Sequence, residues 1–199
     1  MNNFQTPERM RLVESMKELG SVFSERADKY DSEASFPYEN FADLKDAGFL
    51  ALCIPEDHGG MGADFVTYAL VSEELGRHCG STALTFNMHT ASMLLTGQIS
   101  DDLEMSPMQR KDHAEKRSLM WKGVVESGHI HAQPFSEGNQ AGEVAGISSR
   151  AVPVEGGFRV TGKKIFASLS EAADRHNITC LVEGEEEIRF LGIPAGSEG

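Results

Sequence analysis

The spacing of apolar residues changes near residue 118, and this change most constrains how the chain can fold. Before it, Leu12, Met16, Leu19 and Phe23 recur at steps of three and four residues, which is the spacing of one face of a helix. After it, turn residues arrive about every ten positions, and the runs between them favour Val, Ile, Phe and Thr, as strands do. The sequence therefore predicts a helical part followed by a β part.

Capping residues mark the helix ends in the first part. Thr6, Pro7 and Glu8 form a start signal, with a capping hydroxyl, a proline in the first turn and an early acid. Further helices are predicted to start at Pro37, Asp64, Ser81 and Ser106, and Gly48 and Gly97 are expected to end those that start at Pro37 and Ser81.

Two hairpins are predicted in the second part. "SRAVPVEGGFRVTGKKIFAS" turns at residues 155–157, and "NITCLVE" with "IRFLGIP" repeats the arrangement. A further strand is expected in "KGVVESGHIHAQPF". The expected fold class is α+β, with an N-terminal all-α helical domain over residues 1–118 and a small antiparallel β-barrel-like domain over residues 119–199.

The charge balance excludes some partners. With 18 Lys and Arg against 31 Asp and Glu, the net charge of −13 repels phosphate backbones and anionic lipid, so neither nucleic acid nor a membrane is an expected partner. No signal peptide or long apolar run is seen, which predicts a cytoplasmic protein. Cys53, Cys79 and Cys180 show no metal or disulfide spacing and are expected to be reduced core thiols.

Three local patterns have two interpretations each. The glycine-rich loop at residues 57–62 is either a phosphate cradle or, as we favour, a structural turn, because no strand and no lysine accompany it. His129 and His131, two apart on an expected strand, would face one way as half of a metal site, but no third ligand is suitably spaced and no metal is expected. Lys163 and Lys164 could meet a phosphate or form the solvated face of a hairpin.

A further pattern suggests a ligand. Ser136 lies in a glycine-bearing loop at an expected strand end, and Phe166 and Ser168 stand two apart on an expected strand, so that an aromatic ring and a hydroxyl would share one face. Such a surface suits a flat heterocycle. On spacing alone, the alternative is that Phe166 packs in the core and both serines satisfy turns.

Three longer stretches carry motifs in a fixed order: "IPEDHGGMGADFVTYALVSEELGRHCGSTAL", "HAQPFSEGNQAGEVAGI" and "VTGKKIFASLSEAAD". They resemble, in turn, the proline-acid-x-x-Gly-Gly-x-Gly loop and following helix, the Ala-x-x-x-Thr-Glu-Pro-x-x-Gly-Ser-Asp stretch and the Asn-Gly-x-Lys-x-Trp-Ile-Thr-Asn segment of the acyl-CoA dehydrogenase family of flavoproteins. The resemblance covers roughly residues 37 to 195 in order and separation. It implies the N-terminal helical and middle β domains of that fold.

The resemblance implies roles for particular residues. Ser136 takes the place of the threonine that bonds the pyrimidine side of the flavin ring, Phe166 that of the tryptophan that packs on the ring, and Ser168 that of the threonine near flavin N5. Phe135 would contribute backbone beside the ring. The implied cofactor-binding set is Gln133, Phe135, Ser136, Gly142, Phe166 and Ser168, and Phe86 and Met88 would line the acyl pocket unless they form a plain core stripe.

The implied function is FAD-dependent α,β-dehydrogenation of an acyl-CoA or related thioester. Electrons would pass to an electron-transfer flavoprotein or to oxygen, and the full-length protein would be a homo-oligomer. In the family a C-terminal helical domain supplies the catalytic glutamate; we expect that domain to be absent from this chain, so no catalytic residue is assigned here and the chain alone is expected to be inactive. Two alternatives remain open: a flavin-dependent monooxygenase of the same fold, and a non-catalytic degenerate module.

Overall fold

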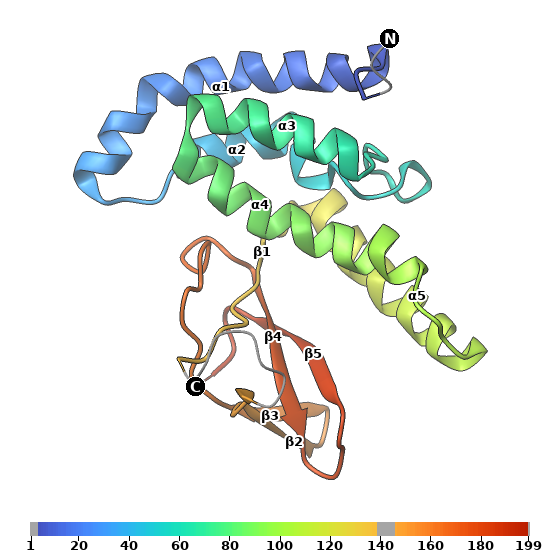
Figure 1. Ribbon diagram of the computed structural model, residues 1–199. Helices are drawn as coiled ribbons and strands as arrows, with labels where there is room; N and C mark the ends of the chain where they lie inside the picture. Colours follow the sequence, from blue (N-terminus) through green and yellow to red (C-terminus); the bar gives the residue numbers. More distant parts are fainter. Residues whose placement is uncertain (1–3, 139–145, 199) are drawn as a thin grey trace. The chain divides into compact units, whose positions relative to one another are not determined.

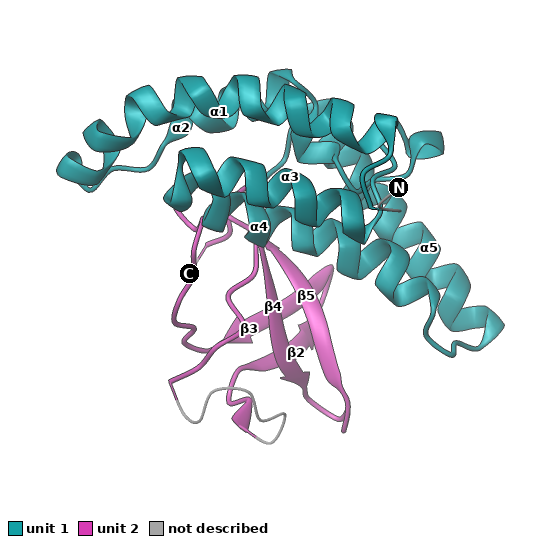
Figure 2. Cartoon of the chain, turned by 45° about the horizontal axis from the view of Figure 1, so that its top comes forward, with its two compact units in different colours: residues 1–130 teal, residues 131–199 magenta. Residues whose placement is uncertain are grey.

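The computed structural model describes residues 4–138 and 146–198. The chain divides into two compact units, Met1–Ile130 and His131–Gly199 (Figure 2). The first unit is helical and the second contains the sheet, so the expected α+β class, a helical part followed by a small sheet, is confirmed.

The described residues of the helical unit form five α-helices and four short helical turns. α1 lies along α3, and α3 along α4 (Figure 1). Thr6, Asp64 and Ser106 cap α1, α3 and α5 with their side chains, as predicted. In chain order the elements are α1 (Pro7–Glu33), α2 (Tyr38–Asp46), η1 (Phe49–Ala51), η2 (Glu56–His58), α3 (Phe65–His78), α4 (Gly80–Leu94), η3 (Leu95–Ile99), α5 (Pro107–Lys122) and η4 (Gly123–Ser127).

Two local predictions in this unit are wrong. α4 begins at Gly80 after Cys79, so Ser81 lies inside its first turn and does not cap it. The strand expected in "KGVVESGHIHAQPF" is reduced to the two residues His131–Ala132, because α5 and then the π-helical η4 continue to Ser127. Trp121 and Val124, three residues apart, are both buried, and this helical spacing prevails over the strand preference of the Val pair.

Helical structure therefore extends past residue 118, where the sequence suggested a domain boundary, and the compact units divide after Ile130. The core of the helical unit is formed by large apolar side chains that have almost no exposed surface. They include Met16, Phe23, Leu44, Phe49, Leu52, Ile54, Leu75, Phe86, Met93 and Trp121.

The second unit contains a five-stranded sheet in which the path β1-β4-β2-β3 is extended by β5 on β4. The two predicted hairpins, β2 with β3 and β4 with β5, are confirmed as antiparallel pairs. The strands are β1 (His131–Ala132), β2 (Arg150–Val154), β3 (Gly157–Thr161), β4 (Arg175–Val182) and β5 (Ile188–Pro194).

The sheet is mixed, however, whereas the sequence suggested only antiparallel pairs. β1 pairs in parallel with the start of β4, at Arg175 and His176, and β2 pairs in parallel with its end, at Leu181 and Val182. The reason is the long connection of residues 162–174, which carries the chain from β3 to the start of β4. This connection is also where half of the candidate site lies.

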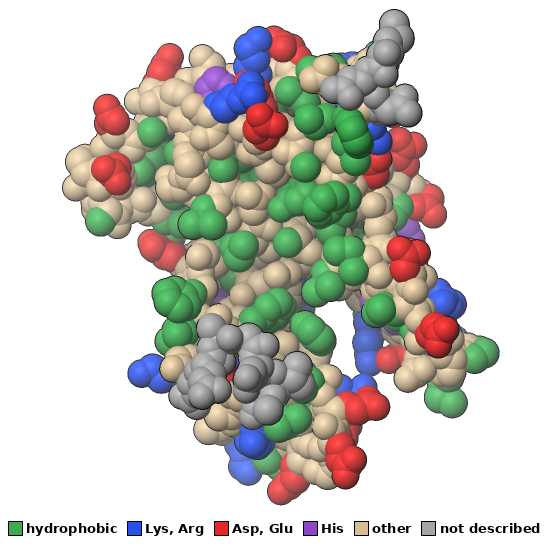
Figure 3. Space-filling model, viewed as in Figure 1, with side chains coloured by type: hydrophobic (Ala, Val, Ile, Leu, Met, Phe, Trp, Pro, Cys, Tyr) green, Lys and Arg blue, Asp and Glu red, His purple; other side chains and the backbone are tan. Residues whose placement is uncertain are grey.

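A small apolar core supports the sheet. Ala151, Ile178, Cys180 and Val182 are buried, and Val160, Leu191 and Ile193 pack against them in part. All three cysteines of the chain are buried and free, as the sequence predicted. Within the described residues, no helix combines the length and apolar character needed to cross a membrane. Figure 3 shows acidic and basic side chains interspersed over one face, so the net charge of −13 is not gathered in one patch there.

Candidate functional site

The candidate site is formed by two segments of the second unit that lie far apart in the sequence. The first, residues 133–138, follows β1, and the second, residues 162–170, follows β3. The backbone N–H of Ile165 donates to the carbonyl oxygen of Ser136 across 2.8 Å. This bond brings Ser136 close to the residue before Phe166, so the structure joins the two segments that the sequence singled out.

Phe166 has a special backbone conformation. Its φ of 55° is in the left-handed region, and so is the φ of 76° at Leu169. Residues 162–167 form no strand, so the expected sharing of one strand face by Phe166 and Ser168 is wrong. The ring of Phe166 is 81% exposed, whereas Leu169 is buried. Left-handed backbone costs a non-glycine residue about 1–3 kcal/mol and concentrates at ligand sites, which favours a ligand surface over the core position considered for Phe166.

Among the described residues, the other expected ligand residues are less exposed than Phe166. Ser136 and Ser168 are half-buried, and so are Gln133 and Phe135. The ring of Phe135 meets the ring of Phe190 on β5 edge to face, with centroids 5.7 Å apart. Phe190 is 61% exposed, which adds a second aromatic surface that the sequence did not suggest. Gly142 lies outside the described residues.

A buried carboxylate lies directly beside Ser136. Glu137 accepts hydrogen bonds from the backbone N–H and the hydroxyl of Ser148, each at 2.6 Å, and from the hydroxyl of Ser149 at 2.6 Å. It also forms an ion pair with Lys164. Only 4% of the Glu137 side chain and 10% of the Lys164 side chain are exposed. The carboxylate therefore lies at the centre of a network that joins three parts of the chain.

Lys164 extends this network to the sheet. Its Nζ donates to the carbonyl oxygen of Thr179 on β4 at 2.7 Å, to the hydroxyl of Thr179 at 3.2 Å and to the carbonyl oxygen of Phe135 at 3.3 Å. Lys163, by contrast, is exposed. Lys164 thus matches neither interpretation considered from the sequence, because it is directed inward to a carboxylate. The sequence gives one sign of this ion pair: Glu137 and Lys164 each lie in one of the two stretches that carry the expected flavin-binding residues.

The electrostatics of Glu137 define what it can do. Burial alone would raise the pKa of Glu137, but hydrogen bonds from Lys164, Ser148 and Ser149 outweigh burial and hold the pKa of this carboxyl well below its usual range. A carboxylate with so low a pKa, whose oxygens are already bonded, is a poor proton acceptor. Glu137 is therefore unsuited to accept a proton from a substrate.

The glycine loop of the helical unit is a turn. The N–H groups of Gly60, Met61 and Gly62 donate to the carbonyl oxygens of Pro55, Ala51 and Ile54 at 2.8–3.1 Å. A Cβ at Gly60 would come within 2.1 Å of the Ile54 carbonyl oxygen. Because these N–H groups are used inside the protein, they cannot cradle a phosphate, and the interpretation as a structural turn is confirmed.

The remaining expected positions are dispersed. Phe86 is fully buried in the helical core and Met88 is half-buried on the same helix, α4. His131 is buried at the start of β1, whereas His129 precedes the strand, so the prediction that they share a strand face is wrong. Gly128, with a φ of 70°, ends the helical run directly before His129. Among the described residues no group of three or more His, Cys, Asp or Glu could hold a metal ion.

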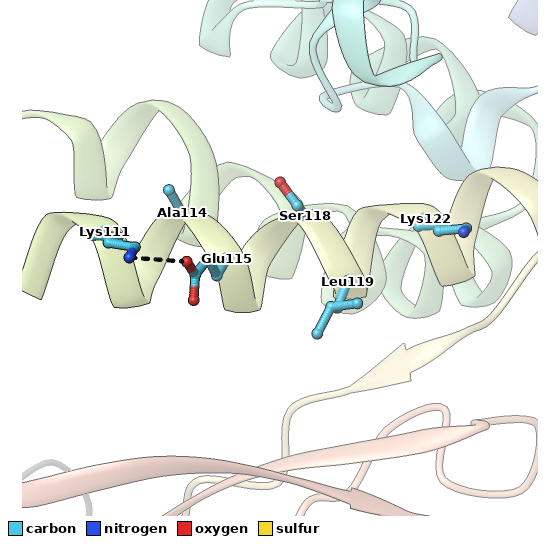
Figure 4. A pocket seen from close by; sticks show the side chains of 6 residues that line it. All are labelled: Lys111, Ala114, Glu115, Ser118, Leu119 and Lys122. Carbon is cyan, nitrogen blue, oxygen red and sulfur yellow. Dashed lines mark ion pairs between the residues drawn. The ribbon is translucent and has the colours of Figure 1, made fainter.

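The helical unit also has two shallow surface hollows. One, of about 550 Å³, runs along α5 and is lined by Lys111, Ala114, Glu115, Ser118, Leu119 and Lys122 (Figure 4). All six side chains come from one helix, and Leu119 is 73% exposed. The other, of about 410 Å³, is lined by Asp57, His58, Gly59, Ser118, Lys122, Val125 and Glu126. Neither includes a residue expected to bind the flavin or the acyl group, although the second is lined in part by the glycine loop that forms the structural turn.

Comparison with known proteins identifies the fold. Residues 6–100 match the family model described as the N-terminal domain of acyl-CoA dehydrogenase. The probable acyl-CoA dehydrogenase YngJ of Bacillus subtilis is 22% identical over 100% of this chain and 51% of its own length. The cyclohex-1-ene-1-carbonyl-CoA dehydrogenase of Syntrophus aciditrophicus is 29% identical over 86% of this chain and 39% of its own length.

The chain is thus similar to acyl-CoA dehydrogenases along its whole length, and its residues 6–100 match their N-terminal domain. It spans about half the length, or less, of the curated relatives it matches. Among solved structures, the FMN-bound TdsC of Paenibacillus sp. A11-2 has a TM-score of 0.76 at 22% identity, over 94% of this chain and 44% of that chain. TdsC is named a dibenzothiophene monooxygenase. The acyl-CoA dehydrogenase fold of this chain therefore also occurs in a monooxygenase.

Proposed function

We propose that this chain forms the flavin-ring and substrate-binding part of a flavin-dependent oxidoreductase of the acyl-CoA dehydrogenase type. The observation that supports this most is the exposed ring of Phe166, held in left-handed backbone beside Ser136 by the bond from Ile165 to Ser136. An aromatic face flanked by half-buried hydroxyls suits a flat, hydrogen-bonding heterocycle. The residues present therefore fit a flavin ring.

Each residue would have a distinct part in binding. The hydroxyl of Ser136 would bond the pyrimidine side of the ring, the ring of Phe166 would pack against it, and the hydroxyl of Ser168 would lie near flavin N5. Gln133 and Phe135 would flank the ring with side chain and backbone, and Gly142 would lie on the pyrophosphate side. FAD is the proposed cofactor, and FMN, which TdsC binds, is the alternative.

The proposed reaction is α,β-dehydrogenation of an acyl-CoA or related thioester. The substrate loses a proton from the α-carbon and a hydride from the β-carbon, so the reaction needs a base and a two-electron acceptor. A bound flavin would supply the acceptor. Glu137 is unsuited to act as the base, because Lys164, Ser148 and Ser149 occupy its oxygens. We propose that the base is supplied by a polypeptide segment equivalent to the part of the relatives that this chain does not match. Phe86 and Met88 would contribute to the acyl pocket.

A flavin-dependent monooxygenase is the second candidate. The bonded carboxylate of Glu137 favours this candidate, because Glu137 is unsuited to act as a base. Oxygen chemistry at a reduced flavin needs no carboxylate base at the substrate α-carbon. The monooxygenase TdsC provides a fold precedent. In either case the physiological acceptor or co-substrate would be an electron-transfer flavoprotein or oxygen, and the whole protein would assemble as a homo-oligomer.

Two assays on the flavin-loaded chain distinguish these functions. The assays are run on the chain alone and with an added polypeptide matching the part of YngJ that this chain does not cover. A dehydrogenase loses visible flavin absorbance when acyl-CoA thioesters of varied length are added without oxygen. A monooxygenase instead consumes oxygen when a flavin reductase is supplied. A chain that binds flavin but shows neither response under both conditions would contradict the proposed oxidoreductase activity.

A further inference from the structure

The pair of Glu137 and Lys164 links the two segments of the site, and both side chains are almost fully buried. Glu137 directly follows Ser136, and Lys164 lies two residues before Phe166. The two charged groups form an ion pair that is almost fully buried. The pair therefore connects the segment that carries Ser136 to the segment that carries Phe166 and Ser168.

The pair is anchored on both sides. On one side, both carboxylate oxygens of Glu137 are held by Ser148 and Ser149, which directly precede β2. On the other side, the Nζ of Lys164 is held by the carbonyl and hydroxyl oxygens of Thr179 in the middle of β4. β2 and β4 are paired strands of the same sheet, so the pair fixes both segments to a rigid element.

The packing around the pair leaves little room for another arrangement. A Cβ at Gly162 would come within 2.2 Å of the Ser149 hydroxyl oxygen, so the chain can approach that serine only as glycine. Ser149 is buried with 1% exposure. Ser149 is therefore closely packed between Glu137, which accepts a hydrogen bond from its hydroxyl, and the backbone at Gly162.

We propose that Glu137 and Lys164 are positioning residues for the flavin ring: their buried ion pair fixes Ser136 on one segment against Phe166 and Ser168 on the other. This inference rests on the proposed function. Neither residue need touch the flavin, because each acts through its neighbour. A ring site of this kind needs its contact groups held within a fraction of an ångström, which supporting hydrogen bonds of this kind provide.

Three variants and a control test the inference in the 199-residue chain. Glu137→Gln and Lys164→Met each remove one charge, and the double variant removes both without leaving an unpaired buried charge. Lys163→Met removes the adjacent exposed lysine as the control. The measured quantities are the dissociation constants for FAD and FMN, the visible spectrum of the bound flavin, and hydrogen exchange at the Ile165 amide without flavin.

We expect each single variant to weaken flavin binding by roughly tenfold or more, to shift the bound-flavin spectrum and to speed exchange at Ile165, whereas Lys163→Met changes none of these. The double variant should regain thermal stability, because no buried charge is left unpaired, but it should not regain flavin affinity or the spectrum. Recovery of all three properties in the double variant would mean that the pair is merely structural and would overturn the inference.

Hydrogen exchange at the Ile165 amide, measured without flavin, tests the positioning role independently of the proposed flavin binding. Unchanged exchange at Ile165 in Lys164→Met would overturn the positioning role whether or not flavin binds. If the unsubstituted chain bound neither FAD nor FMN while exchange at Ile165 still depended on the pair, the proposed function would fail, and the pair would hold the two segments together for another purpose.

Discussion

At the scale of single residues, the most distinctive group is the buried carboxylate of Glu137. Its pKa in the folded protein lies below its ordinary value of 4.5, so its ionised form stabilises the fold at pH values above 4.5, and this stabilisation is lost as the pH falls through the folded value. Near neutral pH, Glu137→Gln should lower the free energy of unfolding by about 3–5 kcal/mol, because Lys164 is left buried without its charged partner.

The difference in unfolding free energy between the unsubstituted chain and Glu137→Gln should then shrink by about 1.4 kcal/mol per pH unit below pH 4.5. Protonated glutamic acid and glutamine are both neutral, which is why the two proteins converge. Urea unfolding at a series of pH values measures this directly. A difference that stays constant into the acid range would show that the charge of Glu137 contributes nothing.

At the scale of elements, the turn at residues 55–63 shows how backbone packing constrains sequence. Gly60→Ala should destabilise the helical unit by about 1–3 kcal/mol, because its new Cβ would meet the Ile54 carbonyl oxygen, which cannot move freely. Gly80→Ala is the matched control: no atom lies within 4 Å of its new Cβ, and it begins α4, so it should stabilise by no more than about 1 kcal/mol. Equal midpoints of denaturation for the two variants would contradict this account of the turn.

Elements whose signals are local could be predicted from the sequence, and those that depend on distant packing could not. The caps at Thr6, Asp64 and Ser106 are local, and so are the glycine turns of both hairpins. The Val-rich stretch after Lys122 has the local pattern of a strand, and its helical form depends on burial of Trp121 and Val124 in the helical unit. The parallel pairing of β2 with β4 likewise depends on the path of residues 162–174, which no short sequence pattern specifies.

The same division applies to the candidate site. Family motifs identified Ser136, Phe166 and Ser168, and the structure supports the closeness of their two segments through the bond between Ile165 and Ser136. The strained backbone of Phe166 could not be predicted, because a left-handed phenylalanine is disfavoured locally and persists only where its surroundings impose it. The pair of Glu137 and Lys164 spans 27 positions and was recognised only in three dimensions.

At the scale of the whole molecule, the two compact units carry different parts of the proposed function. The sheet unit, His131–Gly199, contains the candidate ring site, whereas the helical unit, Met1–Ile130, contains the positions expected to line an acyl pocket. On the proposed function, flavin binding by the chain would depend first on the sheet unit. It should also not depend on a strongly basic surface, because the chain carries a net charge of −13.

The most direct test of the proposed flavin site is the visible absorbance of the purified chain after incubation with FAD or FMN and removal of free flavin. The chain should retain flavin, and a Ser136→Ala, Phe166→Ala double variant should lose it. Phe158→Ala, which removes another exposed phenylalanine beside the turn between β2 and β3, should retain it. Failure of the unsubstituted chain to retain either flavin, or equal retention by the double variant, would contradict a flavin site at Ser136 and Phe166.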